Sequence, residues 1–395
     1  MRLLHTADWH LGRSFHKVGI DDIQRAALQQ ILDLIDEHQV DVLLVAGDIF
    51  DRAIPSTAAV ANYNWMITEL IKRQVPAIFS SGNHDSAERL GVGRAATARG
   101  GIHMYTAPEQ ITEPVRFSVA GASAPLYVYA IPYLDPRAFA GLLGTEMSHQ
   151  AVMAKATEDI STDLAARRQH EPGAQALCLS HVFAQGATSS DSERTIAVGG
   201  VESVSADVFD PFIYTALGHL HRPQRVHGKE HLRYCGSLTK FSFSEVNNTN
   251  QVVLLDVQAA ASGEPEVHQI WVEPLSASLP LAVLSGNFEQ LSDPDLVACY
   301  RDHYLQLTLV DDHPPTDAYR QLTSLYANIL DFRRRWETPR AATNRTYQDQ
   351  LADVTSDEEI CQIFYTHVTG RDYDEPTRER FNEALETVRA ALNTQ

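Results

Sequence analysis

Residue types that bind divalent metals stand in five short clusters of the sequence. Carboxylate, amide oxygen and imidazole are ligands that suit Mn²⁺, Fe²⁺ or Zn²⁺, and the clusters contain no thiolate to select a softer ion. One such cluster alone is weak, at about one functional match in ten, whereas five in order along one chain predict a metal site. The clusters are Asp8-Trp9-His10, Gly47-Asp48-Ile49-Phe50-Asp51-Arg52, Gly82-Asn83-His84-Asp85, Ser180-His181 and Gly218-His219-Leu220-His221.

The spacing within the clusters favours ligands that converge. Side chains two apart in an extended segment point the same way, which places both ligands of D-x-H and of H-x-H on one face. Glycines before Asp48, Asn83 and His219 suit sharp turns out of a strand. The candidate ligands are more than one ion needs, and two ions that share a carboxylate account for the surplus. These candidates are Asp8, His10, Asp48, Asn83, His181, His219 and His221.

Short apolar runs precede the clusters and are predicted to be the strands that position them. Val42–Ala46 is continuously apolar, as expected of a strand covered on both faces. Apolar residues recur every four positions from Asp21 to Gln39, behind two acidic residues, which predicts a helix. This alternation of strand and helix is typical of a layered α/β domain. Further strands are expected at Leu3-Leu4, Val75–Ser80, Ala176–Leu179 and Phe212–Leu217.

The rest of the chain is predicted to hold a small second domain and a helical tail. Strands at Gln251–Val257 and Val267–Val272 finish the first domain as a hairpin, and Pro274–Pro280 marks the boundary. A strand at Tyr304–Val310 and a helix from about Thr316 to Trp336 follow. The predicted domains are 1–277, 278–345 (with an Arg-rich linker) and 346–395. In the tail, Ser356 and Glu359 form a capping box, and Phe381, Leu385, Val388 and Leu392 form an apolar stripe.

The composition limits how the protein can meet its substrate. The chain has 395 residues, with 32 Lys+Arg, 51 Asp+Glu and a net charge of −19. This charge argues against coating nucleic acid by electrostatics alone, so metals, local patches or a partner must hold such a substrate. No apolar run approaches the ~18 residues of a membrane span, and we expect no secretory signal. The four cysteines lack a C-x-x-C pair, which disfavours a disulfide framework and fits a reducing cytoplasm.

Four motifs resemble those of the calcineurin-like metallophosphoesterases, and most closely the SbcD-type nuclease subunits of bacterial SbcCD complexes. They are T-A-D-W-H-L-G, G-D-I-F-D-R, S-G-N-H-D and G-H-L-H-R-P-Q. The resemblance implies a four-layer α/β sandwich with a small α+β capping domain and a C-terminal helical tail. It also implies that His84 lies beside the scissile phosphate, with Asp51 hydrogen-bonding it as a carboxylate–imidazole dyad. By resemblance, Asp8, His10, Asp48 and His221 hold one metal, and Asp48, Asn83, His181 and His219 hold the other, with Asp48 as the bridge.

The same resemblance implies a function. It predicts a nuclease dependent on two Mn²⁺, other divalent ions being possible, that hydrolyses phosphodiester bonds in DNA repair, recombination and replication. The activities it implies are an ATP-dependent double-strand exonuclease, a single-strand endonuclease, and the processing of hairpins and DNA ends. The implied partners are the ATPase SbcC, docked on the tail, and a second nuclease subunit in a homodimer. The implied location is the cytoplasm, associated with the nucleoid and not with a membrane.

Two other functions compete with this one. A phosphatase or small-molecule phosphodiesterase could use the same scaffold, but such phosphatases usually read G-D-x-x-D-R-G and G-N-H-E. Here Ala53 follows Arg52 and Asp85 follows His84, and Leu220 stands where many small-molecule enzymes have Thr. The third possibility is a non-catalytic scaffold for DNA ends, against which the complete ligand set argues.

Several residues near the clusters have simpler explanations. We expect His5 to be a satisfied core or metal-supporting histidine and Cys178 to be a small core residue. Trp9 fits packing over the metals or base stacking, and Arg52 fits a phosphate contact or a loop brace. The arginines between 333 and 345 fit a solvated linker, pairing with the acidic tail, or nucleic-acid contact. These are Arg333, Arg334, Arg335, Arg340 and Arg345.

Overall fold

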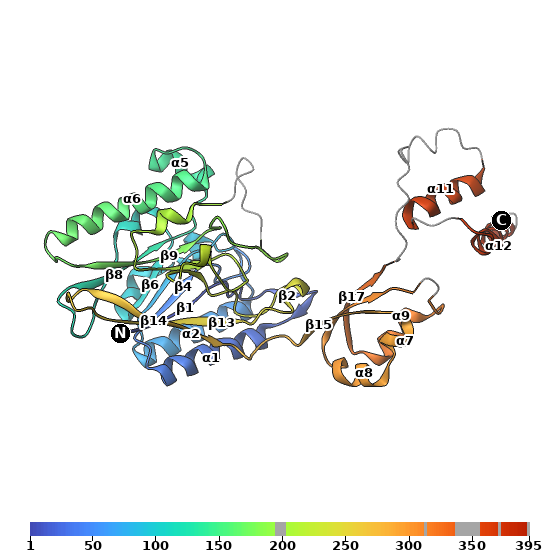
Figure 1. The fold of residues 1–395 in the computed structure, drawn as a ribbon, viewed down its shortest axis with the longest axis horizontal. Helices are drawn as coiled ribbons and strands as arrows, with labels where there is room; N and C mark the ends of the chain where they lie inside the picture. Colours follow the sequence, from blue (N-terminus) through green and yellow to red (C-terminus); the bar gives the residue numbers. More distant parts are fainter. Residues whose placement is uncertain (194–202, 312–313, 336–355, 370–372, 393–395) are drawn as a thin grey trace. The chain divides into compact units, whose positions relative to one another are not determined.

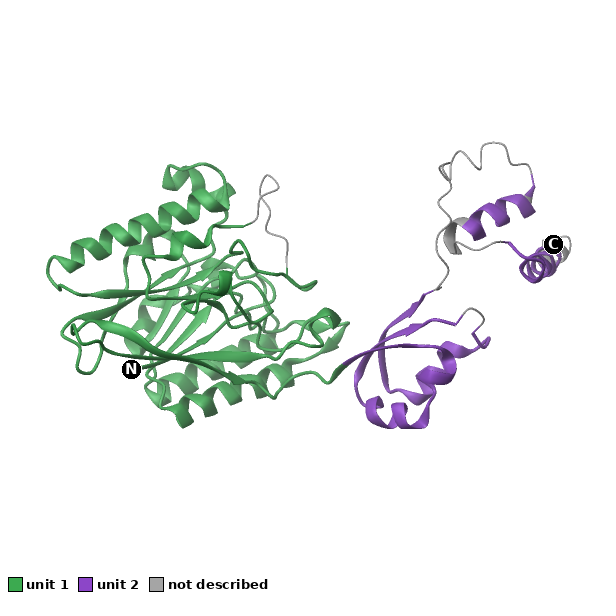
Figure 2. Ribbon diagram, in the orientation of Figure 1, with its two compact units in different colours: residues 1–281 green, residues 282–395 purple. Residues whose placement is uncertain are grey.

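The computed structural model of the chain describes residues 1–193, 203–311, 314–335, 356–369 and 373–392. The chain divides into two compact units, Met1–Leu281 and Ala282–Gln395 (Figure 2). Each unit has its own strands and helices.

Two six-stranded sheets form the centre of the first unit (Figure 1). In each sheet four adjacent strands run parallel, which brings the ends of several strands to one edge. In order, the first sheet is β14 (Pro265–Pro274), β13 (Gln251–Ala259), β1 (Arg2–Thr6), β4 (Val42–Ala46), β5 (Ala77–Ser80) and β6 (Ile102–Tyr105). The second is β11 (Gln224–Arg225), β12 (Leu232–Tyr234), β10 (Tyr214–Gly218), β9 (Gln175–His181), β8 (Pro125–Ile131) and β7 (Val115–Ser118).

Helices cover the outer face of each sheet. In Figure 1, α1 (Asp21–His38) and α2 (Thr57–Arg73) lie on one side of the sheets, and α5 (Pro136–Leu143) and α6 (His149–Arg168) lie on the other. One hydrophobic cluster joins the first sheet to α1 and α2, a second joins the other sheet to α5 and α6, and a third fills the space between the sheets. The predicted four-layer α/β sandwich is therefore confirmed.

Short elements complete the first unit. They are the hairpin β2 (Ser14–Phe15) and β3 (Val18–Gly19), the helices α3 (Ala87–Leu90) and α4 (Arg94–Thr97), and the 3-10 turns η1 (Ala98–Gly100), η2 (Pro108–Thr112), η3 (Ala206–Phe209), η4 (Val226–Gly228) and η5 (Phe243–Glu245).

The predicted elements of the first unit form where their patterns placed them. The helix predicted over Asp21–Gln39 ends at His38, and Gln39 is its left-handed cap with φ 50°. Every residue of β4 is buried, as a strand covered on both faces requires. The predicted hairpin is also present, because β13 and β14 pair antiparallel.

The second unit contains a three-stranded sheet, β15-β16-β17, with three short helices. The helix predicted from about Thr316 to Trp336 is wrong, because α9 ends at Leu325 and a strand follows it. Tyr326 is buried and donates its hydroxyl to the carbonyl of Leu291 (2.9 Å), which turns the chain into β17. β17 then satisfies its backbone by pairing parallel to β16. The bounds are β15 (Leu281–Gly286), α7 (Phe288–Leu291), α8 (Pro294–Tyr300), β16 (Tyr304–Leu309), α9 (Ala318–Leu325) and β17 (Asn328–Arg334).

This correction also moves two of the arginines. Arg333 and Arg334 belong to β17 and not to a linker, and Arg333 pairs with Asp331 at 2.8 Å. Arg340 and Arg345 lie outside the described residues.

Two helices make up the described part of the tail, α11 (Asp357–Thr369) and α12 (Glu375–Leu392). Ser356 caps α11, since its hydroxyl accepts the backbone N–H of Glu359 at 3.2 Å. Phe381 and Leu385 are half-buried on α12, whereas the side chains of Val388 and Leu392 lie outside the described residues. Within the described ranges, no helix is both long and apolar enough to cross a membrane.

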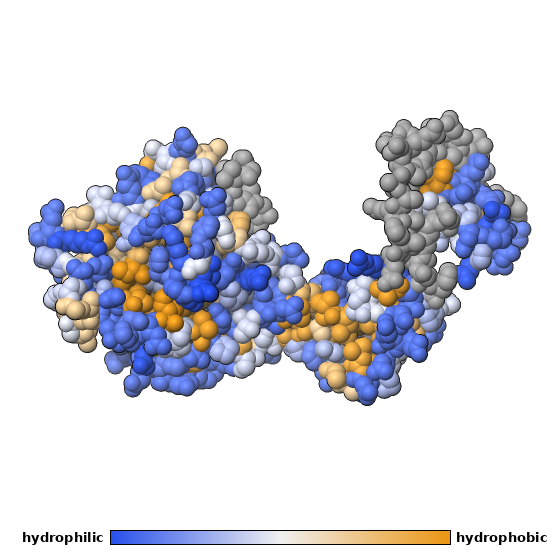
Figure 3. Space-filling view, viewed as in Figure 1, coloured by the Kyte–Doolittle hydropathy of each residue, from blue (hydrophilic) through white to orange (hydrophobic). Residues whose placement is uncertain are grey.

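The face of the molecule in Figure 3 is mostly hydrophilic, with a few hydrophobic areas. The exposed large apolar side chains include Ile54, Val92 and Phe364.

Candidate metal centre

The first two clusters are held together by pairing that continues beyond the ends of β1 and β4. The backbone N–H of Asp8 donates to Gly47 (3.1 Å), and that of His10 donates to Asp48 (2.9 Å). From α1, the buried side chain of Gln24 donates to the carbonyl of His10 at 2.7 Å. The segment that carries Asp8 and His10 is therefore fixed from both sides.

The remaining clusters arrive from β5, β9 and β10. His181 is the last residue of β9 and pairs in register with Gly218 at the end of β10. His219 follows, and its backbone N–H donates to both carboxylate oxygens of Asp8, at 2.9 and 3.1 Å. This bond ties the second sheet to the first. The backbone N–H of His84, from the loop after β5, donates to Asp48 at 2.9 Å.

The three glycines before the ligands are needed for two different reasons. Gly47 has φ +82° and makes the sharp turn that the sequence predicted. The other two allow close approach, since a Cβ at Gly82 would lie 2.1 Å from the Asp48 carboxylate and one at Gly218 would lie 1.7 Å from the Ala46 carbonyl. The predicted turn geometry therefore explains Gly47, and packing explains Gly82 and Gly218.

Four candidate ligands adopt left-handed backbone conformations that non-glycine residues rarely take. Each such residue costs on the order of 1–3 kcal/mol, which the surrounding pairing must offset. They are Asp8 (φ 51°), His10 (φ 44°), Asp48 (φ 50°) and His219 (φ 106°).

The carboxylate of Asp48 lies at the centre of the cluster. Its Oδ2 is 3.5 Å from Nε2 of His10 and 3.4 Å from Nε2 of His181. Nε2 of His84 lies 3.9 Å from the same oxygen. All of these side chains are buried.

The nitrogen and oxygen atoms that could bind a metal face one another. Nε2 of His10 lies 3.0 Å from Nε2 of His221, and Nε2 of His181 lies 3.0 Å from Oδ1 of Asn83. Nδ1 of His181 donates to the carbonyl of Ala46 at 3.0 Å. The lone pair of Nε2 becomes available to a metal once the proton on Nε2, which faces Asn83 and Asp48, is displaced.

Two buried polar atoms of the cluster, His10 Nδ1 and Asn83 Nδ2, have no hydrogen-bond partner. The fit to divalent cations comes from the other atoms of the cluster, because its carboxylate, imidazole and amide-oxygen atoms are the ligands that such ions prefer. Among the described His, Cys, Asp and Glu residues, three sets bring ligand atoms within 4.8 Å of one another, namely Asp8-His10-His221, His10-Asp48-His84 and Asp8-Asp48-His181.

His219 is placed differently from the other predicted ligands. Its ring centroid lies 5.4 Å from that of His181, edge to face, and its side chain belongs to none of the three sets found among the described residues. Its ligand role stays a prediction.

His84 contacts the backbone of Asp51, and the predicted carboxylate–imidazole dyad stays a prediction. Nδ1 of His84 lies 2.8 Å from the backbone carbonyl oxygen of Asp51. Because a carbonyl only accepts, Nδ1 carries the proton and Nε2 faces the site. The Asp51 carboxylate instead lies 3.7 Å from Arg13 and 3.4 Å from Arg52. The turn of the loop therefore helps to orient His84.

The buried charges shift the pKa values of the cluster. Burial raises the pKa of Asp8 to about 7, against the pull of His181 and His221. Burial also opposes ionisation of Asp48, but the neighbouring imidazoles hold its pKa well below the ordinary value. Burial lowers the pKa of His181, yet Asp48 and Asp8 more than offset this and raise it to about 9. Metal binding must therefore displace protons from this cluster.

Four residues that were not predicted from the sequence form hydrogen bonds that hold the ligand clusters in place. Gln24 fixes the first cluster, and the carboxylate of Asp85 accepts backbone N–H groups of Ile49, Phe50 and Gly82. Oγ of Ser192 contacts Nδ1 of His221, and the Ser192 hydroxyl donates to the carboxylate of Glu245. Asp85 lies inside a quoted motif and could have been found, whereas Gln24, Ser192 and Glu245 stand at no spacing that signals a ligand.

The simpler explanations hold for three other residues. His5 is buried and satisfied by Tyr214 (2.9 Å) and the carbonyl of Leu217 (3.2 Å). Trp9 is fully buried against Phe79, which makes it a packing residue and not a stacking platform. Cys178 lies in the core, and all four cysteines are free, as predicted.

Two known protein families each match a part of the chain. Residues 1–130 match the calcineurin-like phosphoesterases, and residues 278–369 match the family SbcD_C, described as the type 5 capsule protein repressor C-terminal domain. The first match includes the first three clusters, and the second includes the small sheet of the second unit and α11.

Three solved structures are similar to the chain at low identity. TT1561 of Thermus thermophilus is 12% identical over 69% of this chain and 98% of its own, with a TM-score of 0.39. GAP50, the anchor in the inner membrane complex of Plasmodium, is 10% identical over 70% and 90%, with a TM-score of 0.43. A dimetal phosphatase from Danio rerio is 12% identical over 70% and 99%, with a TM-score of 0.40. Likeness at this level carries no argument about activity.

Proposed function

We propose that this chain, in which residues 1–130 match the calcineurin-like phosphoesterases and residues 278–369 match the SbcD C-terminal family, is an Mn²⁺-dependent DNA nuclease subunit. The family and the candidate metal centre make it a metal-dependent hydrolase. The single observation that supports a nuclease over other hydrolases is the joint match of a phosphoesterase domain and an SbcD_C domain in one chain.

Within this proposal, the predicted ligands keep their assignments. Asp8, His10 and His221 would hold one ion, Asn83, His181 and His219 would hold the other, and Asp48 would be shared by both. The central position of Asp48 Oδ2, between His10 and His181, supports the bridging role. When bound, two divalent cations supply a water of lowered pKa as nucleophile and neutralise charge on the phosphoryl oxygens.

His84 is proposed to act on the leaving group. Its Nδ1 donates to the Asp51 carbonyl, so proton donation requires the imidazolium form, with a second proton on Nε2. That cation would stabilise the phosphoryl charge and pass the Nε2 proton to the departing sugar oxygen, which leaves the neutral ring protonated on Nδ1. General acid help of this kind is typically worth about 10²–10⁴-fold in rate.

The proposed partners follow from the family. We propose SbcC as the ATPase partner, docked on 346–395, with residues 278–345 as a capping and DNA-recognition domain. DNA ends and hairpins are the proposed substrates, a homodimer the proposed assembly, and the cytoplasm the proposed location. A chain with a net charge of −19 does not attract DNA by its overall charge, and a partner can supply the positive field that it lacks.

The experiment compares substrate classes on purified protein. Single-stranded DNA, linear duplex and hairpin DNA are offered beside nitrophenyl phosphate monoester and diester, with Mn²⁺ or chelator, and with or without SbcC and ATP. We expect Mn²⁺-dependent DNA cleavage, with duplex resection only in the presence of SbcC and ATP. Turnover of the monoester without DNA cleavage would favour the phosphatase, and binding of ends without cleavage would favour the scaffold.

A further inference from the structure

The segment Ser190–Glu193 lies against the metal-distal side of His221, although no ligand cluster contains it. Glu193 accepts the backbone N–H of His221 at 2.8 Å. Oγ of Ser192 lies 2.5 Å from Nδ1 of His221. The ring nitrogen that does not face the cluster is thus occupied by this segment.

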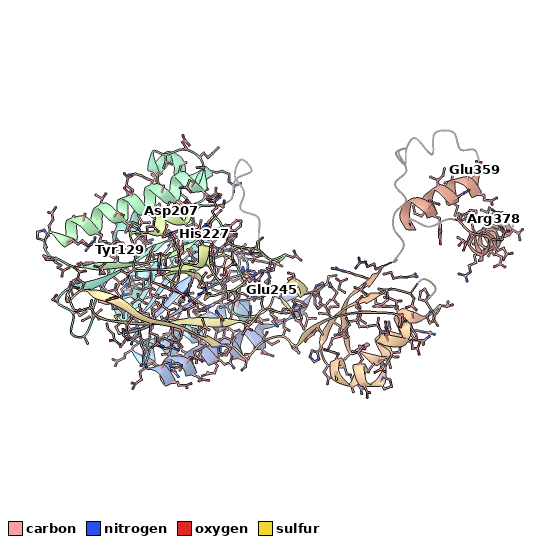
Figure 4. All side chains as sticks on the ribbon, in the orientation of Figure 1. Tyr129, Asp207, His227, Glu245, Glu359 and Arg378 are labelled. Atoms are coloured by element: carbon pink, nitrogen blue, oxygen red, sulfur yellow. The ribbon has the colours of Figure 1, made fainter. Side chains whose placement is uncertain are left out.

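Glu245 anchors the segment from η5 and is labelled in Figure 4. Only 1% of Glu245 is exposed, and its carboxylate accepts the hydroxyl of Ser192 and the backbone N–H of Phe241 (2.8 Å). Oγ of Ser190 lies 3.0 Å from the same carboxylate and 2.8 Å from that of Glu193. Its Oε1 also lies 3.4 Å from Nδ1 of His221. These hydrogen bonds fix the position of the buried Glu245 carboxylate, which serves as their acceptor.

The direction of these bonds fixes the tautomer of His221. An ionised carboxylate only accepts, so the Ser192 hydroxyl donates to Glu245. The Ser192 oxygen is then left to accept the proton of His221 Nδ1. The lone pair of His221 therefore sits on Nε2, which faces Nε2 of His10 at 3.0 Å.

We infer that Glu245, acting through Ser192, is the positioning residue that holds His221 in its metal-binding tautomer and orientation. Histidines that bind metals generally donate their other ring N–H to a carboxylate, carbonyl or water, and such partners matter for affinity. The inference rests on the proposed ligand role of His221, but it does not depend on DNA being the substrate.

Arg13 provides a second anchor for the same segment. Its Nη2 donates to the carbonyl of Ser192 at 2.8 Å, and its guanidinium lies 4.7 Å from the ring centre of Phe241. The Phe241 ring in turn contacts the rings of His10 and His221 edge-on, at 5.2 and 5.3 Å between centroids. Segment, anchors and ligands therefore form one packed group.

The test measures Mn²⁺ binding to the full chain by calorimetry, without DNA. For Glu245→Ala we expect one of the two ions to bind about ten- to a hundredfold more weakly, with the other unchanged. Glu245→Gln keeps an acceptor for the Ser192 hydroxyl and should recover most of the loss. Ser192→Ala should resemble Glu245→Ala. The matched control is Glu273→Ala, a carboxylate 3.5 Å from His38 on the surface, which should change neither ion.

Two results would overturn the inference. One is unchanged affinity for both ions in Glu245→Ala. The other is equal weakening of both ions together with a lower melting temperature of the metal-free variant, which would mean a purely structural role. Failure of the proposed function looks different, because wild-type protein would then bind Mn²⁺ without cleaving DNA.

Discussion

Substitution of His84 is expected to have a different effect from substitution of a metal ligand, although all of these residues lie in one cluster. Nε2 of His84 lies 3.9 Å from Asp48, yet its Nδ1 is fixed by a loop carbonyl and not by the cluster. We expect His84→Gln to keep both ions and to lose about 10²–10⁴-fold in DNA cleavage, because the lost group acts only in the transition state. Metal content and cleavage rate are measured on the same preparation. Loss of both ions in this variant would make His84 a ligand.

His5 should make the stability of the first unit depend on pH. Burial lowers its pKa from 6.5 to about 3, so between these values the unfolded chain binds a proton that the folded chain does not. Stability is therefore fully present above the ordinary pKa and falls as pH falls, by at most about 1.4 kcal/mol per pH unit from this residue.

The measurement is urea unfolding in chelator over a pH series, with His5→Gln as the comparison. Gln can still bond Tyr214 and the carbonyl of Leu217 but cannot titrate. The pH dependence of the free energy of unfolding should be shallower in His5→Gln by this amount. Parallel curves for the two proteins would contradict the assignment.

At the residue scale, the sequence predicted which candidate ligands lie together better than it predicted the residues that hydrogen-bond to them. Asp8, His10, Asp48, His181 and His221 lie together because side-chain type and position after a strand are visible in the sequence. The contact of His84 with the Asp51 carbonyl was not predicted, because a backbone carbonyl leaves no mark in the sequence. Glu245 was missed because its contact with His221 depends on the path of an irregular loop.

Among the elements, the turn after β10 is the most sensitive to added volume. A Cβ at Gly218 would lie 1.7 Å from the carbonyl of Ala46, so Gly218→Ala must push the two sheets apart at the metal centre. We expect a loss of stability of at least about 1–3 kcal/mol and weaker Mn²⁺ binding. The matched control is Gly141→Ala in α5, which meets no atom within 4 Å and should be neutral or stabilising. Equal unfolding curves for the two variants would count against this account.

The strands and helices of the first unit were predictable because their apolar patterns agree with their burial. β17 was not, since Asn328–Arg334 follows a helical segment without a glycine or proline to end it. The burial of Tyr326 and pairing with β16 decide the outcome there. Tertiary contacts of this kind override local pattern and cannot be read from one sequence.

For the whole molecule, the proposed role of the tail depends on another protein. Phe381 and Leu385 share a face of α12 and remain only half-buried. An amphipathic helix with a face of this kind is expected to lie in a partner's groove. Phe381→Glu with Leu385→Glu should abolish co-purification with SbcC and ATP-dependent resection, since each buried side chain contributes about 1.5–3 kcal/mol.

Metal content and Mn²⁺-dependent cleavage of a short single strand serve as controls for this double variant and should persist. Undiminished SbcC binding would refute the docking role. Collapse of the whole protein would instead place these helices in the core.

The central claim is that one carboxylate joins two ions in a DNA-cleaving centre, and Asp48→Asn tests it most directly. Bound Mn²⁺ per chain and DNA cleavage are measured for wild type, Asp48→Asn and the terminal-ligand variant His221→Asn. We predict two ions in wild type, one in His221→Asn, and loss of both ions and of cleavage in Asp48→Asn, because a bridge serves both sites. Two bound ions and near-normal cleavage in Asp48→Asn would contradict the account.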